Sequence, residues 1–169
     1  MASLVYWALW IIFTFVFGVL HELGHAAMSR VFFKDRAWVI TMGSGAPVFT
    51  TKRLIINSWF FAAGKINYSV KEGKKSHHIA RAAGGFIVNI ILAILIFLFA
   101  MQYSSHVYEL PFWWPALPIA LFVNILYAIA TLIPVTYPYG VVKGMPSDGL
   151  QILRLIKNRS KQTNAQKRN

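Results

Sequence analysis

The apolar run from Leu4 to Leu20 reads LVYWALWIIFTFVFGVL, and it leads directly into His21-Glu22-Leu23-Gly24-His25. The run carries no charged residue, so it predicts a helix able to enter a membrane. On a helix, the spacing H-E-x-x-H places two imidazoles one turn apart on one face, where they can share a metal ion. The glutamate between them can act as general base on a water bound by that metal. Titratable side chains are costly inside a bilayer, and those that occur there indicate a functional site.

The composition is that of a membrane protein. The chain has 169 residues, of which 57% are hydrophobic and 13% are charged, whereas an ordinary soluble domain has about 25% charged residues. Cysteine is absent, which excludes a disulfide framework and a thiolate metal site. A zinc ion would therefore need histidine or carboxylate ligands, and the acids are few: Glu22, Asp35, Glu72, Glu109 and Asp148.

Three segments, at about residues 4–28, 82–101 and 116–135, are long and apolar enough to predict membrane spans. Between the first two, residues 36–70 contain short β-rich runs broken by glycine and proline, which predicts a β-hairpin or small sheet. The predicted fold class is an α-helical integral membrane protein, in which a three-transmembrane-helix core carries this β insertion.

The remaining segments complete the predicted organisation. Asp148–Ile156 has the pattern of an amphipathic helix, and residues 1–157 are expected to form one membrane-embedded domain. The basic tail at residues 158–169 is expected to be disordered. The aromatic and proline-rich stretch at residues 111–115 is typical of a membrane interface.

The Lys and Arg residues orient the three predicted spans. Ten lie between residues 30 and 81, none between 102 and 115, and the other seven after residue 142, which places all 17 on one side. The positive-inside rule makes that side cytoplasmic, and it predicts a multi-pass protein of the cell membrane with its N-terminus outside. The net charge of +12 does not indicate nucleic acid, because the cations flank apolar segments and face the lipid bilayer.

A third metal ligand should come from the side of the membrane on which the histidines lie. Asp148 follows the third predicted span and reaches that side, whereas Glu109 lies on the opposite side. Asp35 and Glu72, in the first connection, are rivals. Asp148 also has a purely structural alternative, because an Asp before Gly commonly caps a helix or occupies a turn.

Four stretches together resemble the site-2 protease family of intramembrane zinc metalloproteases. The family's first-helix motif matches residues 17–26, FGVLHELGHA, and its β-hairpin stretch is similar to GSGAP at residues 43–47. GFIVN at residues 85–89 resembles the motif of the second core helix, and LIP at residues 132–134 followed by SDG at residues 147–149 resembles that of the third. The chain departs from the family at Phe86 and Thr131, and its connection from Pro134 to Asp148 is longer than the usual one.

The resemblance implies a site with assigned roles. His21, His25 and Asp148 would ligate one Zn²⁺ per chain, and Glu22 would be the catalytic base. Asn89 and Asn124 lie within predicted spans, where the resemblance and their position suggest contacts with the substrate or the oxyanion. Hydrogen bonding between helices is the alternative for both asparagines.

The implied activity is that of a zinc metalloendopeptidase which cuts within or near the membrane span of a membrane protein or membrane-associated peptide. This is regulated intramembrane proteolysis, with room for a regulatory membrane partner. One alternative is a zinc-binding membrane interaction or immunity protein that does not cleave. Another is a metal transporter or sensor, which needs ligands on several spans. The presence of Glu22 favours cleavage over the first alternative, and the second predicted span, which offers only Asn89, disfavours the other.

Overall fold

The computed structural model describes residues 2–103 and 116–166. Along the chain the elements are α1 (Ala2–Phe33), β1 (Val39–Thr50), β2 (Leu54–Asn67), α2 (Lys75–Tyr103), α3 (Ala116–Leu132), a short 3-10 helix η2 (Gly140–Val142) and α4 (Asp148–Gln166). The predicted β insertion and the helix that begins at Asp148 are confirmed. The predicted interfacial stretch at residues 111–115 lies outside the described residues.

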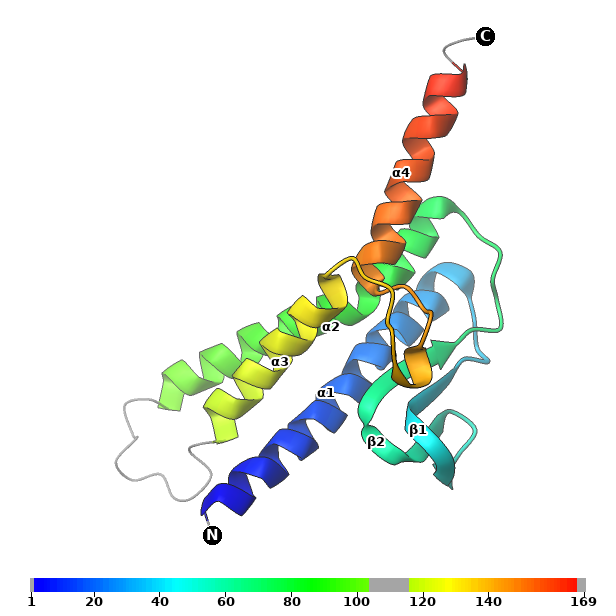
Figure 1. The fold of residues 1–169 in the computed structure, drawn as a ribbon. Helices are drawn as coiled ribbons and strands as arrows, with labels where there is room; N and C mark the ends of the chain where they lie inside the picture. The colour runs from blue at the N-terminus through cyan, green and yellow to red at the C-terminus, as the bar shows by residue number, and fades with distance from the viewer. Residues whose placement is uncertain (1, 104–115, 167–169) are drawn as a thin grey trace.

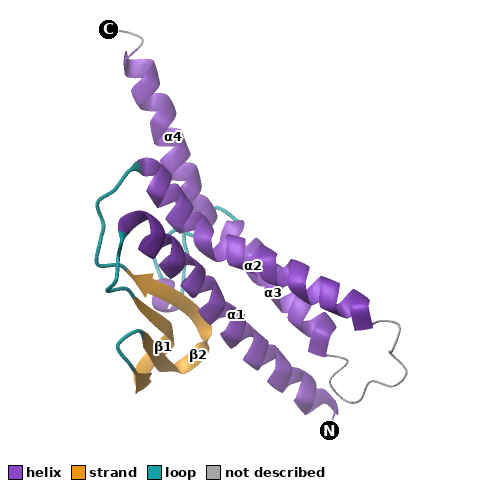
Figure 2. Ribbon diagram, turned by 180° about the vertical axis from the view of Figure 1, so that it is seen from behind, coloured by secondary structure: helices purple, strands orange, loops and turns teal. Residues whose placement is uncertain are grey.

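The helices α1, α2 and α3 lie alongside one another, and the sheet packs on the other side of α1 (Figures 1 and 2). The helices α1 and α2 approach each other closely where two glycines face each other. A Cβ atom on Gly24 would lie 2.3 Å from the Gly84 carbonyl oxygen, and one on Gly84 would lie 2.5 Å from that of Gly24. The two backbones are thus in direct contact at the level of the histidines, as small residues permit.

The predicted three-transmembrane-helix core is wrong. Among the described residues, two helices are long and apolar enough to cross a membrane, Leu4–Phe33 and Lys75–Gln102. The 17 residues of α3 extend over about 26 Å, which is shorter than a hydrocarbon core of about 30 Å. The helix ends at Leu132 because Pro134 disfavours helical geometry at Ile133. The inference that all Lys and Arg residues lie on one side of the membrane required three spans, so it is no longer supported.

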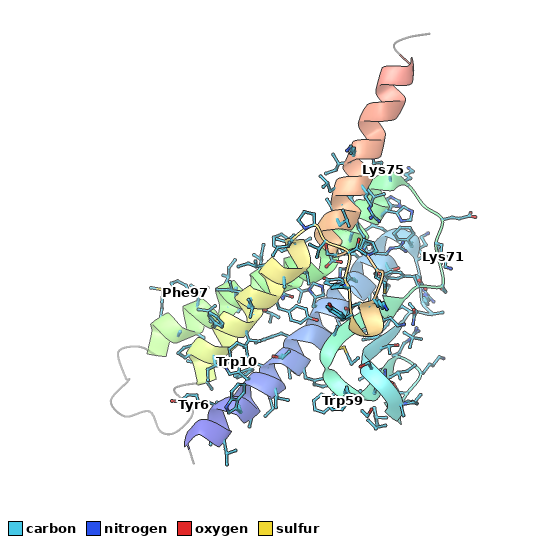
Figure 3. All side chains as sticks on the ribbon, viewed as in Figure 1. Tyr6, Trp10, Trp59, Lys71, Lys75 and Phe97 are labelled. Carbon is cyan, nitrogen blue, oxygen red and sulfur yellow. The ribbon has the colours of Figure 1, made fainter. Side chains whose placement is uncertain are left out.

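The outer faces of α1 and α2 support membrane association. Large apolar side chains on them are exposed, among them Ile12, Ile91, Ile94 and Leu95, and a wide exposed apolar surface is typical of contact with lipid or a partner. Figure 3 shows Lys71 and Lys75 at the end of the molecule where α2 begins. Tyr6, Trp10 and Phe97 lie toward the opposite end of the bundle (Figure 3).

The two strands form an antiparallel sheet with an unusual register. Ile40 pairs with Ile66 near the end of β2 and also with Leu54 at its start, so β2 flanks the first part of β1 on both sides. Gly43 has a φ of +74° and meets the Trp59 carbonyl oxygen so closely that no Cβ atom would fit. Ile40, Met42 and Ile66 are buried with Ala26 of α1, and this cluster holds the sheet on the helix.

The connection from α3 to α4 folds into a small hairpin, which we call the 135–147 hairpin. Ser147 N–H donates to the Val135 carbonyl oxygen (2.9 Å), Tyr137 N–H donates to that of Met145 (3.0 Å), and η2 forms the tip. Val142 in η2 is buried, and η2 contacts β2. Beyond the hairpin, α4 runs to Gln166, so residues 158–166 are helical and not disordered as predicted; residues 167–169 lie outside the described chain.

Candidate metal centre

The three predicted metal ligands meet in the structure. His21 and His25 lie one turn apart on α1, and Asp148 is the first residue of α4. His21 Nε2 lies 3.1 Å from His25 Nε2 and 3.0 Å from Asp148 Oδ2, which is 3.3 Å from His25 Nε2. All three residues are buried. Among the described residues they form the one cluster of three such side chains that can hold a metal ion.

The rival acids are used elsewhere or point away. Asp35 is buried, but its carboxylate accepts hydrogen bonds from Ser69 Oγ (2.5 Å) and from the backbone N–H groups of Ala37, Ser69 and Val70. Glu72 is exposed in the loop before α2. Glu109 lies outside the described residues. Asp148 is therefore the carboxylate that the fold brings to the histidines.

Ser147, which the sequence reasoning missed, is the cap of α4. Its Oγ accepts a hydrogen bond from the Leu150 N–H (3.2 Å) and donates to the Ile133 carbonyl oxygen (2.6 Å). A capping side chain satisfies a free N–H of the first helical turn, so the carboxylate of Asp148 is not needed for that role. The signal was present in the sequence, since serine is as good a cap as aspartate.

Close backbone contact fixes where Asp148 lies. A Cβ atom on Gly149 would lie 1.9 Å from the Leu132 carbonyl oxygen, so only glycine allows α4 to start against the end of α3. Burial alone would raise the pKa of Asp148, but when His21 and His25 are protonated at Nε2, their hydrogen bonds and charge lower it to about 2. The carboxylate is thus ionised at neutral pH and can ligate a cation.

The second nitrogen of each imidazole faces an oxygen. His25 Nδ1 lies 2.7 Å from the Arg81 carbonyl oxygen, and His21 Nδ1 lies 3.2 Å from Asn89 Oδ1. A carbonyl oxygen can only accept, so His25 Nδ1 carries a proton and donates; the Gly85 N–H, at 3.3 Å from the same atom, is the longer contact. A neutral imidazole protonated at Nδ1 has its lone pair on Nε2. His25 therefore turns a lone pair toward His21 and Asp148, which is the arrangement that a cation requires.

Glu22 stands beside this cluster without belonging to it. The next residue on a helix is rotated by about 100°, which takes the Glu22 carboxylate away from the shared face of His21 and His25. It is 6% exposed and lines the cavity described below. A Cβ atom on Gly64 of β2 would lie 3.1 Å from Glu22 Oε1, so this glycine leaves room for the carboxylate.

A cavity of about 510 Å³ opens onto a set of four residues, His21, Glu22, His25 and Asp148. One wall is the end of β2, from Ala63 to Ile66, and another is formed by the 135–147 hairpin. Tyr127 and Thr131 of α3 complete the lining, and the Tyr127 ring lies 5.2 Å from that of His21. The cavity is large enough for several residues of an extended peptide, and its walls are mostly apolar.

Two further residues of the site were missed by the sequence reasoning. Tyr137 lines the cavity, and burial, followed by the charges of Asp148 and Glu22, raises its pKa to about 12. Arg81 supplies the carbonyl for His25, while its guanidinium lies over the rings of Phe33 and Tyr68 and donates to the Val70 carbonyl oxygen. These contacts come from tertiary packing, and no local pattern signals them.

The two asparagines lie away from the cavity wall in the described structure. Asn89 and Asn124 are both 0% exposed, and neither lines the cavity. Asn124 Nδ2 donates to the Asn89 carbonyl oxygen (2.7 Å), and Asn89 Nδ2 lies 3.5 Å from the carbonyl oxygen of Asn124. The interhelical hydrogen bonding offered as the alternative is therefore observed.

Comparison with known proteins adds no family assignment, because the chain matched no protein-family model, no curated protein and no solved structure. The resemblance to site-2 proteases therefore remains a prediction that rests on the four sequence motifs.

Proposed function

We propose that this protein is a zinc metalloendopeptidase that cuts membrane proteins or membrane-associated peptides within or near their membrane span. The observation that carries the proposal is the convergence of His21, His25 and Asp148, with Glu22 left free in the adjoining cavity. Three ligands from the protein and an open position are typical of catalytic zinc sites, and closed four-ligand sites are typical of structural ones.

The donor set fits zinc. Imidazole nitrogen and carboxylate oxygen are common ligands of this ion, and two histidines with one acid form a known catalytic combination. Bound zinc would supply Lewis acidity, which makes a water nucleophilic near neutral pH and polarises the scissile carbonyl. Transport of a metal ion would need a polar path with ligands on several helices, and in the described residues the cluster draws on α1 and α4 alone.

The chain's own residues would then move the proton. Glu22 faces the cavity next to the ligands, where it would accept a proton from the attacking water and pass it to the amine of the leaving peptide. Asp148, ionised and buried, would keep its ligand position through this transfer. Tyr137, whose raised pKa keeps its hydroxyl protonated, can donate a hydrogen bond to the substrate in the same cavity.

The end of β2 would hold the substrate. A helical substrate hides its carbonyl groups in hydrogen bonds, so the cut segment has to be extended. Residues 63–66 border the cavity, and an extended peptide can add to such an edge through main-chain hydrogen bonds. Gly64 would bring the substrate backbone close to Glu22.

We also propose how the protein sits in the membrane. With α1 and α2 as spans, their connection, which is rich in Lys and Arg, would be cytoplasmic by the positive-inside rule. The ligand histidines lie in the C-terminal half of α1, so the site would lie toward the cytoplasmic face.

The test compares wild type with Glu22→Gln, using Glu72→Gln as a matched control because Glu72 is exposed and outside the site. Each protein is expressed in the same host, its zinc content is measured after purification in detergent, and membrane proteins are surveyed for new peptide ends.

Wild type and Glu72→Gln should produce the same new ends in membrane segments. Glu22→Gln should retain about one zinc per chain and lose at least about 100-fold in cleavage, the lower bound for a general base. Cleavage by Glu22→Gln at the wild-type rate would refute the proposal, and zinc binding by a wild type that cuts nothing would favour the non-cleaving alternative.

A further inference from the structure

A chain of buried polar groups crosses all three packed helices at the level of the metal ligands. His21 of α1 is 2% exposed, and Asn89 of α2 and Asn124 of α3 are each 0% exposed. His21 Nδ1 contacts Asn89 Oδ1 at 3.2 Å, and the two asparagines exchange contacts between their amides and backbone carbonyl groups. Burying a polar side chain costs free energy unless the side chain is hydrogen-bonded. The burial of three such side chains in contact with one another therefore indicates a specific role.

The contacts decide which way the Asn89 amide faces. Its Nδ2 lies toward the Asn124 carbonyl oxygen, which can only accept, so Nδ2 is the donor there and Oδ1 is the atom that faces His21. An amide oxygen accepts as well. His21 Nδ1 must therefore carry the proton and donate, which leaves the Nε2 lone pair toward His25 and Asp148.

Helix α2 also fixes the place of the His21 ring. Gly85 and Asn89 are four residues apart and share one face of α2. A Cβ atom on Gly85 would lie 2.4 Å from His21 Nε2, so the ring occupies the space that glycine leaves open. The His21 imidazole thus packs directly against Gly85, and its Nδ1 contacts Asn89 Oδ1.

We propose that Asn89 is a positioning residue of the metal centre, and that the backbone carbonyl group of Asn124 in α3 orients its amide. Asn89 acts by accepting the Nδ1 proton of His21, which selects the tautomer and orients the ring so that Nε2 meets the metal. This inference rests on the proposed function in one respect, that the ion held by His21 is zinc. It replaces the expected contact of Asn89 with substrate, because the side chain is fully buried and is absent from the cavity lining. His25 has the equivalent partner in the Arg81 carbonyl group, so both imidazoles have the same tautomer.

Three variants separate positioning from plain helix packing. Asn89→Leu removes the acceptor at similar volume, and partners of this kind typically contribute 10- to 100-fold to metal affinity. Asn89→Asp keeps an oxygen for His21 and gives up only the long contact to the Asn124 carbonyl oxygen. Asn124→Leu removes the shorter bond between α2 and α3 but leaves the His21 contact in place.

The measurement is the zinc dissociation constant of the full chain in detergent, by competition with a chelator, together with the absorption spectrum of bound Co²⁺. Asn89→Leu should weaken zinc binding by about 10- to 100-fold and alter the Co²⁺ spectrum. Asn89→Asp should bind within about threefold of wild type or more tightly. Asn124→Leu should lower the unfolding temperature while zinc affinity stays within about threefold. Unchanged affinity in Asn89→Leu, or an equal loss in Asn124→Leu, would overturn the proposal.

A second measurement needs no variant at this buried position. In wild type labelled with ¹⁵N-histidine, with His21 assigned by comparison with His21→Gln, the Nδ1 of His21 should appear protonated in both zinc-loaded and zinc-free protein. A proton on Nε2 instead would overturn the proposal even if Asn89→Leu does not fold. Because neither readout involves cleavage, a failure of the proposed peptidase activity can be told apart from a failure of this inference.

Discussion

Ser147 and Asp148 are neighbours with separate tasks at the start of α4. The serine hydroxyl caps the helix and also ties it to the end of α3 through Ile133. The aspartate is thereby released to turn its carboxylate toward the histidines. One local sequence, Ser-Asp-Gly, thus supplies a helix cap, a carboxylate that can ligate a metal ion and a glycine that permits backbone contact.

This division predicts opposite results for two variants. Asp148→Asn should weaken zinc binding by at least about 10-fold, since a neutral amide is a poorer ligand than a carboxylate, and should leave helix content unchanged. Ser147→Ala should lower the free energy of unfolding by about 1 kcal/mol through loss of the cap. It should weaken zinc binding less than Asp148→Asn does. Chelator competition and thermal melts followed by circular dichroism measure both quantities. Full zinc affinity in Asp148→Asn would remove it from the ligand set.

The residues of the site show what sequence can and cannot provide. The spacing of His21, Glu22 and His25 is local, and the scarcity of acids left few partners, so the ligand set was predictable. The contact between Asn89 and His21 was not predictable, because it depends on which face of α2 meets α1. That face is set by Gly24 and Gly84, whose backbone contact appears only in three dimensions.

At the scale of elements, Asp35 ties the two ends of the β insertion together. It follows α1, and it accepts hydrogen bonds from Ser69 and Val70, which follow β2. Burial disfavours its charged form, but the hydrogen bonds from Ser69, Ala37 and Val70 outweigh that effect and lower its pKa. The carboxylate therefore fixes where the sheet leaves and rejoins the helices, and with it the wall of the cavity.

This contact predicts an acid-sensitive contribution to stability. Because the pKa of Asp35 is lower in the folded chain than in the unfolded chain, the contribution is complete above the unfolded value, about 3.9. It is lost as the pH falls through the folded pKa. Asp35→Asn should lower the free energy of unfolding at pH 7 by about 1–3 kcal/mol and should lose less stability than wild type on acidification. Thermal melts from pH 7 to about pH 3 measure this, with Glu72→Gln as the control; parallel curves for wild type and Asp35→Asn would contradict it.

The elements also explain where sequence reasoning failed. The β insertion was predictable from its glycines, and α1 and α2 from their apolar length. The third predicted span was overextended because its apolar pattern continues through Ile133, past the point where Pro134 ends the helix. The 135–147 hairpin had no local signal, since its bonds join Val135 to Ser147 and its tip depends on contact with β2.

At the scale of the whole molecule, the bundle has one charged end and apolar flanks. Ten of the 17 Lys and Arg residues lie from Arg30, near the end of α1, to Arg81, near the start of α2, and large apolar side chains on both helices are exposed. This distribution supports the proposed arrangement of two spans with a cytoplasmic connection.

The two-span arrangement predicts the compartment of inserted reporters. A reporter at Glu72, in the exposed loop before α2, should be cytoplasmic, and a reporter fused before Met1 should be on the other side. Alkaline phosphatase and fluorescent protein fusions measure this, and zinc content confirms that each fusion still folds. Signals from the same compartment at both positions would contradict α1 as a span.

The separation of the ligands along the chain has a consequence in time. Asp148 follows His21 by 127 residues, so at about 5–20 residues per second of synthesis the histidines precede their carboxylate partner by about 6 to 25 s. During that interval the nascent chain has two imidazoles and Glu22 but no third ligand. The cluster of His21, His25 and Asp148 therefore cannot form until α4 has been made, and the order of synthesis itself delays the completion of the site.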